Sequence, residues 1–194
     1  MACKQLIKYF LVLLALLIVA CGSPESKKMK FFDKGTELYA KGEYTKATIN
    51  FSNAIKIDPN FAEAYSMLGL SLLKQMKFKP AYGSLSKAIE LNPDLLDAQA
   101  ALGKILLLGR QKDKAWEKAK LVLAKNPGHE EALLLKANCL LVDGKVPDAE
   151  QILKSLIEKN PKTEIAYLIL ANIRLKQKDM QGAEKILRDL LARN

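Results

Sequence analysis

Apolar and polar positions along the chain follow a helical pattern rather than the strict alternation of a strand. Apolar side chains recur at spacings of three and four residues in pairs of stripes, and a short polar turn such as "AKGEY" or "VDGKV" separates the two stripes of a pair. A proline after Asp or Asn ends the second stripe. The pattern predicts an all-α protein with paired helices at residues 28–41 and 45–57, 62–75 and 79–91, 96–109 and 113–125, 130–143 and 147–159, and 164–177 and 181–193.

The pairs repeat with a constant period. Four prolines are spaced by 34 residues, and small residues recur in step with them in two further columns. The first column holds glycine or alanine and lies in the first helix of each pair; the second holds alanine and lies in the second helix. These small residues let the two helices approach closely, and no single pair can bury its apolar face alone, so the pairs must stack. The three columns are Pro59, Pro93, Pro127 and Pro161; Gly35, Gly69, Gly103, Ala137 and Ala171; and Ala47, Ala81, Ala115, Ala149 and Ala183.

With these columns, the chain resembles the tetratricopeptide repeat (TPR). The second pair carries the match with Tyr65, Leu68, Gly69, Leu72, Phe78, Ala81, Leu85, Ala88 and Pro93, and the first pair has as many matching positions. The third pair departs from the pattern, since Gln99 and Lys112 stand in its aromatic columns. The resemblance implies a right-handed α-solenoid over residues 28–194, with repeats at 28–61, 62–95, 96–129, 130–163 and 164–194.

The N-terminus has the pattern of a secretory leader. Lys4 and Lys8 precede an apolar run over residues 9–20, which as a helix rises only about 18 Å and is short for a permanent membrane span. Its end, Ile18-Val19-Ala20-Cys21, resembles a bacterial lipobox. That resemblance implies a signal peptide at 1–20, cleavage before Cys21, lipidation of Cys21, and a linker at 21–27. A plain signal peptide and an uncleaved anchor are the alternatives.

Gly22 and Ser23 follow the cysteine where the family's inner-membrane signal has Asp, which favours the outer membrane. The expected location is therefore the bacterial cell envelope, with the chain lipid-anchored and facing the periplasm. The expected partners are other envelope proteins, and the membrane through the lipid anchor. Nucleic acid is not expected as a partner.

Candidate chemistry is sparse. The chain has one histidine, His129, which follows Pro127-Gly128 and is predicted to be a solvated turn residue. Cys139 stays alone in the helical region once Cys3 leaves and Cys21 is lipidated, which predicts a single buried thiol and no intramolecular disulfide. Phosphate loops, metal-ligand spacings and nucleophile elbows do not occur in the sequence. We therefore predict no enzymatic activity, no catalytic residues, no metal site and no cofactor.

Binding is the remaining function. In this family the first helix of each repeat lines a concave groove, and equivalent asparagines there bond the backbone of an extended peptide. The resemblance implies a groove for a peptide or partner helix at Leu70, Leu73, Lys104, Leu107, Asn138, Leu141 and Asn172, with Ser66, Ala100, Leu134, Leu168 and Leu175 beside them. The basic clamp for a C-terminal carboxylate is missing, since Ala100 and Leu134 stand where lysine is wanted. Packing between repeats is the competing interpretation of the leucines, and also of Trp116.

Charge supports an alternative function. The formal net charge is +10, and residues 96–129 hold seven basic and three acidic residues. A basic patch there would bind an anionic polysaccharide through charge; a solvated helix face is the competing interpretation. The predicted patch comprises Arg110, Lys112, Lys114, Lys118 and Lys120.

The layout as a whole is similar to the N-terminal part of longer TPR lipoproteins of exopolysaccharide export and exosortase (PEP-CTERM) protein sorting. The last predicted helix carries Ile186, Leu187, Leu190 and Leu191 without a polar capping helix after it. We expect further repeats, a partner or a second copy to cover this stripe, and a frayed final helix is the alternative.

Overall fold

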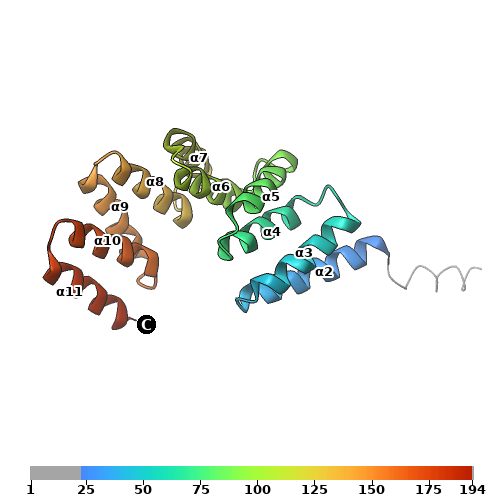
Figure 1. Ribbon diagram of the computed structural model, residues 1–194, viewed down its shortest axis with the longest axis horizontal. Helices are drawn as coiled ribbons and strands as arrows, with labels where there is room; N and C mark the ends of the chain where they lie inside the picture. The colour runs from blue at the N-terminus through green and yellow to red at the C-terminus, as the bar shows by residue number, and fades with distance from the viewer. Residues whose placement is uncertain (1–22, 194) are drawn as a thin grey trace, which may run out of the picture. The chain divides into compact units, whose positions relative to one another are not determined.

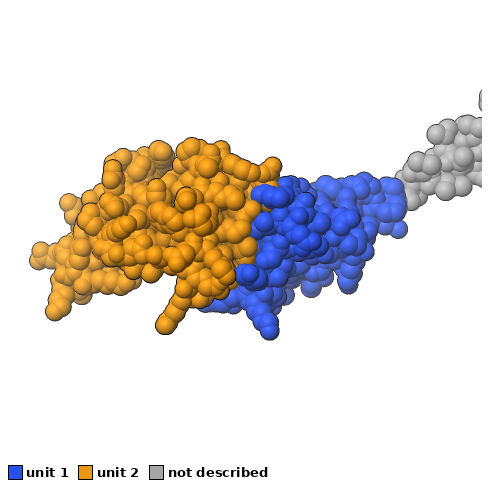
Figure 2. All heavy atoms as spheres, turned by 90° about the horizontal axis from the view of Figure 1, so that it is seen from above, with its two compact units in different colours: residues 1–93 blue, residues 94–194 orange. Residues whose placement is uncertain are grey.

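The computed structural model describes residues 23–193, and within this range the chain forms ten helices and no strands. They form two compact units, which Figure 2 shows in different colours. Unit 1 ends at Pro93 and contains α2 (Pro24–Ala40), α3 (Tyr44–Ile57), α4 (Ala62–Lys74) and α5 (Phe78–Leu91). Unit 2 begins at Asp94 and contains α6 (Leu96–Leu108), α7 (Lys112–Lys125), α8 (Glu130–Val142), α9 (Val146–Lys159), α10 (Glu164–Lys176) and α11 (Met180–Leu191).

All five predicted helix pairs are confirmed, and only one helix end differs substantially from its predicted position. The first helix begins at Pro24 rather than at residue 28, so residues 24–27 of the predicted linker are helical. Ser23 caps this helix by accepting a hydrogen bond from the Ser26 N–H at 3.1 Å, and proline is well suited to the first helical position. The prediction missed this start because it took the polar segment after the leader for a loop.

Each helix pair packs through the predicted columns of small residues. In unit 1, α2 packs on α3 and α4 on α5 (Figure 1), and Phe51 and Leu85 at these crossings are fully buried. A Cβ atom added at Gly69 would lie 2.6 Å from Leu85 Cγ, and one added at Gly35 would lie 2.6 Å from Phe51 Cε1. These two glycines therefore set how closely the helices approach.

The core of unit 2 joins three helices. One core cluster takes Leu134 and Leu140 from α8, Leu153 from α9 and Leu170 from α10. Trp116 of α7 packs against this cluster, which confirms the packing interpretation of the tryptophan. Successive helices thus bury one another's apolar faces, as stacking repeats require.

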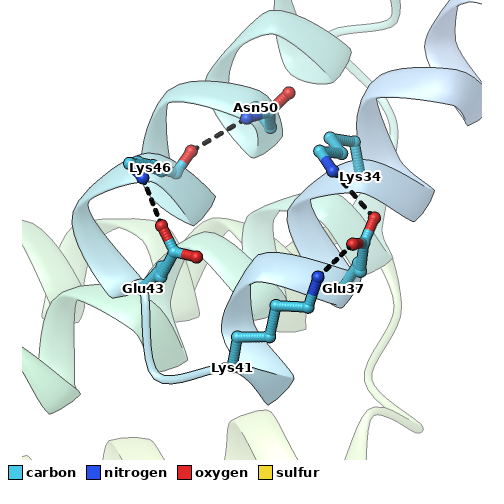
Figure 3. A network of polar contacts seen from close by, with 6 residues as sticks. All are labelled: Lys34, Glu37, Lys41, Glu43, Lys46 and Asn50. Carbon is cyan, nitrogen blue, oxygen red and sulfur yellow. Dashed lines mark hydrogen bonds and ion pairs between the residues drawn. The ribbon is translucent and has the colours of Figure 1, made fainter.

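Charged side chains cover the turn between α2 and α3. Glu37 accepts from Lys34 at 2.9 Å and from Lys41 at 2.5 Å, while Glu43 pairs with Lys46 (Figure 3). The hydrogen bond from Lys41, and then that from Lys34, lowers the pKa of Glu37 to about 2. Exposed pairs of this kind add little stability, but they neutralise the lysines of this turn.

The turn inside each repeat places one residue in the left-handed region. The five positions are again spaced by 34 residues, and φ there is 75° at Gly42, 58° at Met76, 59° at Arg110, 74° at Gly144 and 63° at Lys178. The next N–H bonds back to the last turn of the first helix, as from Lys77 to Leu72 O at 2.9 Å. Glycine adopts this conformation without strain and is the usual residue after a helix end of this kind. Three of the five turns are therefore strained.

We predict that Gly69→Ala destabilises the protein by about 1–3 kcal/mol, because the new methyl group collides with Leu85. Gly83→Ala is the matched control: Gly83 is also helical, but an added Cβ atom has nothing within 4 Å. This control should gain about 1 kcal/mol from helix propensity. Urea unfolding of the two variants should move in opposite directions; a shift of the same sign in both would contradict the close packing of α4 on α5.

We further predict that Lys178→Gly stabilises the protein by about 1 kcal/mol, because it relieves a left-handed conformation in a non-glycine residue. The reverse change at the equivalent turn, Gly144→Ala, should cost about 1–2 kcal/mol. Thermal unfolding measures both effects. Equal melting temperatures for wild type and the two variants would show that these turns adopt another conformation in solution.

Candidate functional site

A surface groove lies between the first helices of the fourth and fifth repeats, within unit 2. Its volume is about 640 Å³, and α8 and α10 supply most of its walls. Its lining comprises Leu107, Asn138, Leu141, Val142, Val146, Ile165, Leu168, Ile169, Asn172, Ile173, Lys176 and Gln177.

The groove is mainly apolar and open to solvent. Val142 is 64% exposed, Leu168 52% and Ile165 50%, while Leu107 and Leu141 are half-buried. Large apolar side chains that are grouped and exposed in this way are typical of interaction sites rather than of an inert surface. A small number of polar groups beside them is the usual composition of a binding groove.

The two asparagines of the groove lie one repeat apart but differ in their contacts. Asn138 is half-buried and donates from Nδ2 to Leu134 O of its own helix at 2.9 Å. Asn172 is exposed, and its side chain forms no hydrogen bond within residues 23–193. Asn172 therefore offers both a donor and an acceptor to a ligand, whereas Asn138 offers its carbonyl oxygen and one remaining N–H.

The predicted lining is only partly brought together. Leu107, Asn138, Leu141, Asn172 and Leu168 lie in the groove. Leu70 and Leu73 are half-buried in unit 1, and Lys104 is exposed on α6 outside the lining. Ser66, Ala100 and Leu134 are buried, so they pack instead of facing a ligand, and Leu175 is exposed outside the groove.

Ile165 and Ile169 are lining residues that the prediction missed. The prediction rests on equivalent positions in successive repeats. The position of Ile165 is acidic in the three preceding repeats, where it holds Glu63, Asp97 and Glu131, so equivalence does not mark it as part of an apolar groove. The spacing of Ile165, Leu168, Ile169 and Asn172 within one helix shows a shared face and was the available signal.

The five residues of the predicted basic patch are not five free cations. Lys112 pairs with Asp143 at 2.7 Å and with Asp113 at 3.3 Å. Lys118 is partly buried and donates to Gln99 Oε1 at 2.7 Å, and burial lowers the pKa of its ammonium group. Arg110 and Lys114 are exposed, while Lys120 lies 3.4 Å from Glu117. The patch therefore carries less unpaired charge than its composition suggests.

His129 is not the solvated residue that the sequence predicted. It is 8% exposed and caps α8, where its Nδ1 atom accepts from the Ala132 N–H at 3.4 Å. Its Nε2 atom lies 3.0 Å from Asp97 Oδ1 at the start of α6. The prediction failed because the partner carboxylate lies at the opposite end of the same repeat, at the start of α6, which the local sequence around His129 does not reveal.

The Glu131 carboxylate lies 3.4 Å from Nδ1 of His129, so His129, Asp97 and Glu131 form a cluster of potential metal ligands. The two carboxylates face different nitrogens of the ring. This arrangement suits a hydrogen-bonded helix cap better than three ligands converging on one ion.

Cys139 is fully buried as a free thiol, which confirms the prediction for this residue, and burial raises its pKa. A buried thiol with a raised pKa is a poor nucleophile. The other predicted modification site, Cys21, lies outside the described residues with the rest of the leader. Across residues 23–193, no helix has the length and apolar character needed to cross a membrane.

Comparison with protein families identifies the repeats. Residues 35–75 match the model described as TPR repeat, and residues 113–169 match the model described as tetratricopeptide repeat. Such repeats generally form non-enzymatic scaffolds for protein–protein interaction. No curated protein sequence matches the chain significantly.

Solved structures agree with the family models. A thermophilic TPR protein of Thermus thermophilus, TTC0263, has a TM-score of 0.74 at 23% identity, over 86% of this chain and 91% of its own. PilF of Pseudomonas aeruginosa has a TM-score of 0.66 at 16% identity, over 88% and 78%. YrrB, described as a TPR protein with an unusual peptide-binding site, has a TM-score of 0.58 at 19% identity, over 88% and 89%. The chain therefore carries tetratricopeptide repeats and has their all-α helical-repeat fold.

Proposed function

We propose that this protein is a non-enzymatic interaction scaffold that binds a peptide or partner helix in the groove of unit 2. The observation that carries the proposal is the open apolar groove of about 640 Å³ in which Asn138 and Asn172 stand one repeat apart. A related fold in YrrB is described as having a peptide-binding site, which supports this use of the architecture.

The groove favours recognition through apolar side chains and backbone amides rather than through charge. Lys176 is its one charged lining residue, so a ligand gains little from ion pairing. An amide side chain can donate to a backbone carbonyl and accept from a backbone N–H, which fixes the register of an extended segment. Leu168 and Ile165 would then contact the ligand's apolar side chains.

We place the scaffold at the cell envelope, held by lipid on Cys21, where it supports an assembly or export machinery. The lipobox-like end of the leader supports the anchor, and the similarity of layout to TPR lipoproteins of exopolysaccharide and exosortase systems supports the pathway. Three acyl chains would give a durable anchor, because each buried methylene adds about 0.8 kcal/mol.

Binding of an anionic polysaccharide by the third repeat is the alternative, and the structure gives it less support. Two of its five cations are already engaged within the chain, since Lys112 pairs with Asp143 and Lys118 donates to Gln99. The alternatives respond differently to salt: charge-driven binding weakens as salt rises, whereas apolar groove binding does not.

The test of the scaffold is capture of partners by the full-length protein, cross-linked in its native envelope and then purified. We predict that specific envelope proteins accompany wild type and that Asn138→Ala with Asn172→Ala lowers their recovery about tenfold or more, because each lost hydrogen bond to a buried backbone group costs about 1–3 kcal/mol.

Asn50→Ala is the control for capture. Asn50 is half-buried like Asn138 and donates to Lys46 O at 2.9 Å, the same bond to its own helix, but it lies in unit 1. Recovery of an anionic polysaccharide without protein partners would refute the scaffold. It would also be refuted if Asn50→Ala lowered the recovery of partner proteins as much as Asn138→Ala with Asn172→Ala does.

The lipid anchor is tested by the mass of the mature chain. We predict a chain that begins at Cys21 and carries diacylglycerol and an acylated amine. Cys21→Ser should abolish both the lipid and the cleavage, since the thiol is the acceptor. Cys139→Ala should leave the lipid unchanged because Cys139 is buried. Cleavage at another residue, or a mature chain without lipid, would contradict the anchor.

A further inference from the structure

Three large apolar side chains are exposed together at the beginning of α5, in unit 1. Met76 is 73% exposed in the turn before the helix, Tyr82 is 45% exposed and Phe78 is 37% exposed. Phe78 and Tyr82 are four residues apart on one helix and therefore share a face. Their exposure leaves apolar area uncovered that a single folded chain normally hides or uses.

The same segment is basic and contains no acid. Between Glu63 and Glu90 the sequence has four lysines and neither Asp nor Glu. Lys74, Lys77 and Lys79 are exposed and form no ion pair within residues 23–193; the hydrogen bond from Lys77 goes to the neutral Gln75 at 2.9 Å. We call the set the α4–α5 surface: Lys74, Met76, Lys77, Phe78, Lys79 and Tyr82.

The equivalent turn of the first repeat shows that lysines here need not stay unpaired. At the α2–α3 turn, Lys34, Lys41 and Lys46 are all paired with Glu37 or Glu43 (Figure 3). This turn lies next to the α4–α5 surface, because Thr45 Oγ1 donates to Gln75 Oε1 at 3.4 Å. The free charge of unit 1 at this end is therefore concentrated on the α4–α5 surface.

Met76 adds a third observation. It occupies the left-handed position of its turn, where the equivalent residues are glycine in two repeats and a cation in the other two. An exposed methionine contributes little to packing, although its backbone adopts the strained left-handed conformation. Strain of this kind at an exposed side chain points to a role for that side chain.

We propose that the α4–α5 surface docks on an anionic lipid bilayer. Aromatic rings favour the headgroup level of a membrane, and unpaired lysines are attracted to acidic lipids. Met, Phe and Tyr are also common in protein–protein interfaces, but lysine is depleted there, so the three unpaired lysines favour a lipid surface over a protein partner. The proposal is independent of the groove in unit 2 and of lipid at Cys21, since it concerns how unit 1 lies against the bilayer.

The test uses the full chain in vesicles of phosphatidylcholine alone and of phosphatidylcholine with an equal amount of phosphatidylglycerol. Phe78→Trp in a Trp116→Phe background places one fluorophore on the surface. We expect its emission to shift to shorter wavelength and to be quenched by brominated acyl chains only in the anionic vesicles, with both effects lost at high salt.

Removing charge gives the quantitative result. The triple variant Lys74→Gln, Lys77→Gln and Lys79→Gln should lower the equilibrium ratio of docked to undocked protein about a hundredfold. Each lysine contributes a factor of roughly five to this ratio. The control removes three other exposed lysines from the opposite end of unit 1, by Lys27→Gln, Lys30→Gln and Lys56→Gln, where Lys28 and Asp58 join α2 to the end of α3. It should keep docking within about fivefold of wild type.

Hydrogen exchange of the wild-type chain supplies a second readout if the tryptophan variant does not fold. Residues 74–83 should gain protection in anionic vesicles and not in neutral ones. Equal quenching or equal protection in both vesicles, equal loss in the control, or protection that depends on protein concentration instead of lipid charge would overturn the proposal. The last result would mean that a second copy covers the surface.

Discussion

The close packing of the two helices in each repeat is the contact on which the rest of the structure depends. Leu85 is fully buried against Gly69, and Phe51 against Gly35, at crossings that leave no room for one more carbon atom. Within each unit, a helix pair joined this tightly still has apolar faces to cover, and the next pair covers them, as α4 does for α3 and α8 does for α7. Within unit 2, the first helices of the fourth and fifth repeats thereby present equivalent residues to one groove, which is how Asn138 and Asn172 come to lie together.

Most of the fold could be predicted from the sequence because its signals are local and repeated. A proline after Asp or Asn and a turn inside each repeat mark the helix ends, and the structure repeats its left-handed turn positions with the same spacing of 34 residues. The failures have a different physical origin. His129 pairs with Asp97 at the opposite end of the third repeat, and Lys112 is neutralised by Asp143, thirty-one residues away. Such pairings depend on how the helices stack, and the sequence around each residue does not reveal them.

The groove illustrates the same division. Leu107, Leu141 and the two asparagines follow from equivalence between repeats, whereas Ile165 stands in a column that is acidic in the three preceding repeats. Because Ile165 replaces an acidic residue, the first helix of the fifth repeat is more apolar here than the first helices of the three preceding repeats. The apolar surface that a ligand can contact in the groove is correspondingly larger. The groove is therefore a property of particular residues in the fourth and fifth repeats, and the fold alone does not supply it.

Site-specific photo-cross-linking in living cells shows whether the groove binds a protein segment. A photoreactive amino acid in place of Leu168 lies in the groove, whereas one in place of Leu121, also exposed and in unit 2, lies outside it. We predict discrete protein adducts from position 168 and none from position 121. Adducts of the same proteins from both positions, or none from position 168, would contradict this prediction.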